Sequence, residues 1–130
     1  MATLSDPKLS IDLLTGSEPN VTVTVTVGLT PFESFFLSNG LSLQLVSKLV
    51  GDDRGISGGR DDDLFFFPTQ NVTREGIYTF QSIVSSGTLN EDNSIFNRGD
   101  EIFANFNLRS TEQIFPLNVS INSPTIEGSF

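Results

Sequence analysis

The chain has 130 residues, a modest hydrophobic fraction of 37% and a formal net charge of −9. This length suits one domain with one buried core, spanning residues 1–130. The chain contains no cysteine and no histidine, which excludes disulfides, thiolate or imidazole metal sites and the usual serine–histidine–aspartate catalytic arrangement. Its acidity argues against nucleic acid or an anionic membrane as a partner, because both bind clustered Lys and Arg.

The N-terminus carries no targeting signal that we can identify. It lacks the basic start and apolar run of a signal peptide, and no apolar stretch approaches the ~20 residues of a membrane span. We therefore expect a cytoplasmic protein by default, or a domain excised from a larger or exported protein.

The first two predicted strands are Lys8–Leu14 and Val21–Leu29, joined by a turn at residues 15–19. Valine and threonine alternate through the second strand, and successive side chains of a strand point to opposite faces of its sheet. Both residue types are β-branched, which favours strand over helix. The pattern predicts an antiparallel sheet with a dry valine face and a wet threonine face.

A short helix is predicted next. Thr30-Pro-Phe-Glu33 has the form of a capping box with proline at the first helical position, and Asn39-Gly40 is a suitable end. Within it Phe32, Phe35 and Phe36 fall at i, i+3 and i+4, so their rings share one face. Two interpretations stay open: a lid over one end of the fold, or an exposed platform for a partner or a second copy of the chain.

Five further strands are predicted, at Leu41–Val50, Leu64–Phe67, Gly76–Ser85, Glu101–Arg109 and Leu117–Ile121. Seven strands separated by turn signals indicate an all-β, immunoglobulin-like antiparallel β-sandwich, with jelly-roll and C2-like sandwiches as alternatives. We expect the valines of the second strand to pack against apolar residues of the third and sixth predicted strands: Leu41, Leu43, Leu45, Ile102, Phe106 and Leu108.

Two loops, 51–63 and 89–101, hold the densest charge. If the strands run up and down in order, both loops lie at one end of the sandwich, where calcium would neutralise carboxylates that otherwise repel one another. Neither loop matches an EF-hand, so a solvated hairpin tip is the alternative. The candidate calcium ligands are Asp52, Asp53, Asp61, Asp63, Asp92 and Asp100.

Residue types that serve catalysis are scarce. The chain has no tryptophan for stacking sugars and no glycine-rich loop that opens a helix, so we predict a protein that is not an enzyme and needs no cofactor. The leading hypothesis is a protein-interaction or self-assembly module, whose partner is another protein or a second copy. The alternative is calcium-dependent ligand or carbohydrate binding through the acidic loops, and a hydrolase using Asp61–Asp63 and Asp100 is a third.

Overall fold

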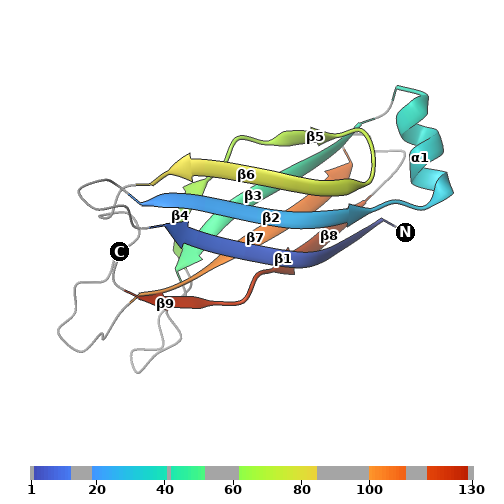
Figure 1. Cartoon of the computed structure of the whole chain (residues 1–130). Coiled ribbons are helices and arrows are strands. Elements are labelled where there is room, and N and C mark those ends of the chain that lie inside the picture. Colours follow the sequence, from blue (N-terminus) through green and yellow to red (C-terminus); the bar gives the residue numbers. More distant parts are fainter. Residues whose placement is uncertain are drawn as a thin grey trace.

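The computed structural model describes residues 2–12, 19–40, 42–51, 62–84, 100–110 and 117–128. The described chain is mostly β, with two antiparallel sheets that lie face to face and one short helix at one end (Figure 1). The prediction of an all-β fold with one helix between the second and third strands is confirmed.

Sheet A has the strand order β1-β2-β6. Its strands are β1 (Thr3–Asp12), β2 (Asn20–Gly28) and β6 (Gly76–Ile83). The central strand β2 is the valine–threonine strand. Val23 lies opposite Leu9 of β1 and Phe80 of β6, so the three face the core together.

Sheet B has the order β4-β3-β7-β8, with β5 also paired to β3 and β9 to β7. Its strands are β3 (Leu43–Gly51), β4 (Asp62–Phe66), β5 (Gln70–Val72), β7 (Asp100–Ser110), β8 (Asn118–Asn122) and β9 (Ile126–Gly128). In the described chain β4 and β5 share one side of β3, and β8 and β9 share one side of β7. The sandwich therefore has three strand positions in sheet A and four in sheet B.

Two differences from the predicted strands have local causes. The three-residue strand β5 is too short to give a periodic signal, and it was missed. After the last predicted strand, which corresponds to β8, a further short strand, β9, follows that was not predicted. Between β8 and β9, Ser123 keeps the chain bonded to β7. Its backbone N–H donates to Ala104 O at 2.8 Å, and its hydroxyl accepts from Ala104 N at 2.8 Å. The proline at 124, which has no N–H to donate, then interrupts the ladder.

The core lies between the two sheets and contains the predicted residues. The four valines of β2 are at most 1% exposed, while the threonines between them are half-buried. A chain of aromatic rings joins the layers, with ring centroids 5.9 Å apart for Phe67–Phe80 and 6.4 Å apart for Phe80–Phe106. Of the predicted core residues, Leu41 lies outside the described residues, and the rest share one cluster: Leu43, Leu45, Ile102, Phe106 and Leu108.

Strand β1 carries an irregularity that the alternation did not predict. Its pairing with β2 shifts between Ser5 and Lys8, and Asp6 there has φ +51°. This left-handed conformation costs most residues energy but is tolerated by Asp better than by β-branched residues. The bulge brings Lys8, not Pro7, opposite Thr24.

Candidate functional site

The first candidate surface is the helix α1 (Pro31–Ser38), which follows β2 directly. Ser34 N donates to Thr30 O at 3.0 Å, and the Glu33 carboxylate accepts from Thr30 N at 3.1 Å and from Thr30 Oγ1 at 2.6 Å. At the other end the Phe35 carbonyl accepts from Ser38 Oγ and Asn39 Nδ2, and Gly40 has φ +88°. The predicted capped helix, with its end at Asn39-Gly40, is confirmed.

Glu33 anchors this helix. Its side chain is buried, with only 3% exposed. Burial raises the pKa of this carboxyl, but the hydrogen bonds from the Thr30 side chain and backbone lower it by more, so the pKa of Glu33 lies below its ordinary value. The carboxylate is therefore ionised at neutral pH, and it holds the first turn of α1 in place.

Two of the three predicted rings point into solvent. Phe32 is 58% exposed and Phe35 is 64% exposed, whereas Phe36 is half-buried and packs edge-on against both. The helix instead meets the core through Leu37. Together Phe32, Phe35 and Phe36 form what we call the α1 aromatic surface. Helix α1 lies beyond one end of the sandwich (Figure 1), and an exposed platform describes Phe32 and Phe35 better than a lid.

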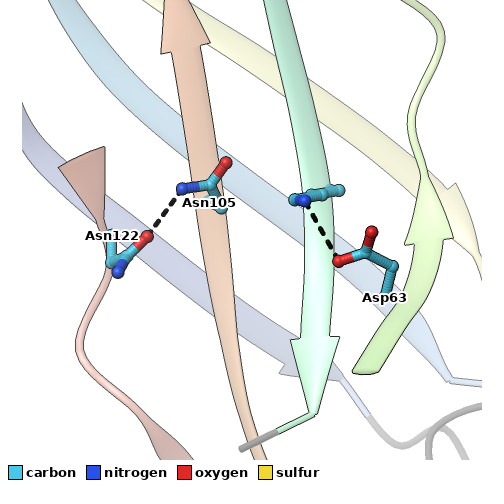
Figure 2. Close-up of polar contacts among 4 residues, drawn as sticks. Asp63, Asn105 and Asn122 are labelled. Carbon is cyan, nitrogen blue, oxygen red and sulfur yellow. Dashed lines mark hydrogen bonds and ion pairs between the residues drawn. The ribbon is translucent and has the colours of Figure 1, made fainter. Parts of the chain in front are cut away.

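The second candidate surface is a shallow groove on the outer face of sheet B, with a volume of about 400 Å³. Strands β3, β4, β7 and β8 contribute its walls and floor. Asn105 Nδ2 donates to Asn122 Oδ1 at 2.7 Å across the β7–β8 pair (Figure 2). The lining residues are Lys48, Val50, Asp63, Phe103, Asn105, Ser120 and Asn122.

A polar network continues along β7 and β8 below the groove. Asn107 Nδ2 donates to Asn118 Oδ1 at 2.6 Å and to Ser120 Oγ at 3.2 Å. These hydrogen bonds fix the amide rotamers, and each amide group keeps further donor and acceptor capacity for a ligand. The outer face of sheet B therefore presents a pre-organised row of neutral polar groups.

The charges of the groove are paired. Lys48 Nζ lies 3.0 Å from Asp63 Oδ1, with both side chains partly exposed. Lys48 Nζ also lies 5.8 Å from the centre of the Phe66 ring, which is 59% exposed on the same face. An uncharged ligand could contact three kinds of group on this surface, namely side-chain amides, one ion pair whose charges balance, and an accessible aromatic ring.

The predicted acidic cluster falls mostly outside the described residues. Asp52, Asp53, Asp61 and Asp92 lie there, and for Asp100 only the backbone, at the start of β7, is described. Asp63 alone has a described side chain, which is paired with Lys48. Within the described ranges no three acidic residues gather as a metal site would require. The calcium site therefore stays a prediction.

Sequence reasoning missed the groove, although part of its signal was readable. The alternation of β7 places Phe103, Asn105 and Asn107 opposite the core, and Phe103 lies on that outer face but is only 9% exposed. The partners of these residues come from other strands, and no local pattern indicates that Asn122 lies opposite Asn105.

Comparisons of the chain with protein-family models, with characterised proteins and with solved structures found no match. Among the described residues, no helix has the length and apolar character needed to span a membrane. The fold and surface of this chain are therefore the basis for any functional conclusion.

Proposed function

We propose that the chain is a non-enzymatic, immunoglobulin-like sandwich module that works by binding another protein or a second copy of itself. The lack of cysteine and histidine supports a binding role over a catalytic one, because the commonest nucleophile–base pairs need one of them. The α1 aromatic surface is the proposed contact.

The strand order supports the immunoglobulin-like assignment. In that fold seven strands A to G form the sheets ABED and CFG. Taking β1, β2, β3, β6, β7 and β8 as A, B, C, E, F and G gives A-B-E in sheet A and C-F-G in sheet B. The fourth strand position of the described chain, held by β4 and β5, pairs with β3 instead of β6, and in this it departs from the constant-type arrangement.

The observation that carries the binding role is the exposure of Phe32 and Phe35 on neighbouring turns of one helix. Fully burying a Phe side chain contributes about 1.5–3 kcal/mol, and aromatic residues are enriched in the buried centres of interfaces. The capping hydrogen bonds to Glu33 hold the helix, so the rings are presented without a large ordering cost on binding.

A matched pair of variants tests the α1 aromatic surface. Phe35→Asp replaces the most exposed ring of that surface with a charge, and Ser34→Asp adds the same charge to an exposed neighbour on the same helix. We expect light scattering to show association of the wild-type chain that Phe35→Asp weakens and Ser34→Asp leaves unchanged. A strictly monomeric chain, or association unaffected by Phe35→Asp, would count against self-assembly through α1.

A second candidate function is binding of a neutral carbohydrate in the groove of sheet B. Sugar hydroxyls both donate and accept hydrogen bonds, as do the amides of Asn105 and Asn122, and the exposed ring of Phe66 offers a stacking face. The paired charges of Lys48 and Asp63 favour an uncharged ligand. This candidate places the sugar on the sheet, whereas the sequence suggested the acidic loops.

Calorimetry with neutral oligosaccharides tests this candidate. Asn105→Ala should abolish the binding heat, whereas Asn71→Ala, an exposed amide on β5 that does not line the groove, should preserve it. Repeating the titration with calcium and then with a chelator separates groove binding from calcium-dependent binding through the acidic loops. An equal loss of heat in both variants would exclude the groove.

A further inference from the structure

Strand β6 forms one edge of sheet A, since β2 is its only partner among the described strands. The direction of its backbone groups follows from two hydrogen bonds. Thr79 O accepts from the side chain of Gln70 at 2.7 Å, and Val84 N donates to Pro19 O, which lies on the β2 side, at 3.0 Å. Backbone groups alternate along a strand, so the odd-numbered residues direct their N–H and C=O groups away from β2. An edge of this kind can accept another strand.

The side chains of the same residues lie on the outer face of sheet A. Two of them are isoleucines with large exposed areas, Ile77 at 74% and Ile83 at 68%. Thr79 and Gln81 between them are also exposed. An exposed isoleucine at each end of an edge strand is unfavourable for a monomer and is the kind of feature that edge strands usually avoid.

The spacing of the two isoleucines is symmetric about Phe80. In an antiparallel pair of strands, the residue numbers of two facing residues always add up to the same value. If Phe80 faces Phe80 of the second copy, Ile77 therefore faces Ile83 and Thr79 faces Gln81. Each isoleucine then contacts an isoleucine of the other copy. A slip by one pairing step in either direction leaves both Ile77 and Ile83 without an isoleucine partner.

Charge favours the same pairing. The chain carries a net charge of −9, which makes two copies repel, but residues 76–83 contain no charged side chain. On the outer face of sheet A, the neighbours of these β6 residues are Thr22, Thr24 and Thr26 of β2, which are also neutral. This strand is therefore a surface where two acidic copies approach with little like-charge contact.

We propose that two copies of the chain pair antiparallel through β6, in the register that places Ile77 opposite Ile83 of the other copy. The facing residues exchange backbone hydrogen bonds, and sheet A becomes one continuous six-stranded sheet, β1-β2-β6-β6-β2-β1, with a two-fold axis at Phe80. In the monomer the Gln70 side-chain amide donates to Thr79 O at this edge. In the dimer this amide is displaced, and Thr79 O accepts from a backbone N–H of the second copy instead. This dimer uses a surface distinct from the α1 aromatic surface.

Single-cysteine variants test the register directly, because the wild-type chain has no cysteine. In the proposed dimer positions 77 and 83 of different copies face each other with Cβ atoms about 5 Å apart, whereas the two copies of position 77 lie about 20 Å apart. We expect an oxidised mixture of Ile77→Cys and Ile83→Cys to form the mixed cross-linked dimer, and each variant alone to form little. Equal cross-linking in all three samples, or none, would overturn the register.

Sedimentation of charge variants tests the surface independently of the cross-link. Ile77→Lys should weaken dimerisation by more than about tenfold, because it removes both cross-strand Ile77–Ile83 contacts of the dimer. Ser10→Lys, which adds the same charge to the exposed outer face of β1, should leave it unchanged, and Gln70→Ala should strengthen it about fivefold by clearing the edge. A monomer at all concentrations, or equal effects of Ile77→Lys and Ser10→Lys, would refute the β6 dimer. Weaker association of Phe35→Asp together with normal 77–83 cross-linking would support both the α1 contact and the β6 dimer as separate contacts.

Discussion

Ser47 is a polar residue in the apolar core, and replacing it should stabilise the fold. Its side chain faces inward from β3 between Leu45 and Leu49, opposite Phe106 of β7, and it is 0% exposed. The Ser47 carbonyl accepts from Phe67 N at 3.0 Å, but its hydroxyl has no hydrogen-bond partner among the described residues. Burying a hydroxyl without compensation costs about 1–3 kcal/mol by mutational measures.

Ser47→Ala removes that cost together with one oxygen atom. The small void and the lower strand preference of alanine reduce this gain in stability by less than about 1 kcal/mol. We therefore expect the free energy of unfolding to rise by about 0.5–2 kcal/mol. Urea denaturation followed by far-UV circular dichroism measures the change. The midpoint should move to higher urea with an unchanged slope, which separates a gain in stability from a change in the compactness of either state.

Ser10→Ala is the matched control, since Ser10 is exposed on β1 and the same atom is removed there. Its midpoint should change little. If Ser47→Ala lowers the free energy of unfolding by more than Ser10→Ala does, the Ser47 hydroxyl must be hydrogen-bonded in the folded chain. The account of Ser47 as an uncompensated polar group would then be wrong.

Three further predictions concern the core, the helix and the bulge. Phe106→Ala should lower the free energy of unfolding by about 3–5 kcal/mol in urea, because Phe106 is fully buried, and a loss below about 1 kcal/mol would show that the core tolerates a cavity there. Folding lowers the pKa of Glu33 below its ordinary value of 4.5, so the ionised carboxylate stabilises the fold. This stabilisation is fully present above pH 4.5 and is lost as the pH falls through the lower pKa of the folded state. Glu33→Gln should lack this part of the acid dependence in urea titrations at stepped pH, and parallel profiles for the two proteins would contradict it. Asp6→Val should lower stability by about 1–2 kcal/mol because φ is +51° at this position, whereas Asp6→Gly should change it little, and equal thermal shifts for both would exclude backbone strain as the cause.

The elements of this fold were predictable where the local pattern and the tertiary environment agree. The valines of β2 alternate with threonines because one face meets the core and the other meets water, and all four valines are buried as the pattern indicates. Helix α1 was predictable for a similar reason. Its capping residues, Thr30 and Glu33, lie three positions apart, so the interaction that starts the helix is visible in the sequence.

The surfaces were less predictable because they depend on pairing between distant strands. Nothing near Asn105 in the sequence indicates that Asn122 will face it or that Asp63 will reach Lys48. The exposure of Phe35 was also open, since a helix with three rings on one face can bury or display them. Here Leu37 makes the contact with the core, and this choice depends on how the whole helix is placed.

The repeated valine–threonine pattern of β2 has a consequence for how this strand finds its position. A slide of two residues replaces every valine with a valine and every threonine with a threonine, so the middle of the strand cannot distinguish the correct alignment from its neighbours. The C-terminal end can. A slide that moved Thr26 to the place of Gly28 would put a β-carbon 2.6 Å from Thr3 Oγ1, and a slide the other way would draw Pro31 toward a ladder to which it cannot donate. The middle of the strand is uniform, and Gly28 and Pro31 at its C-terminal end set its alignment.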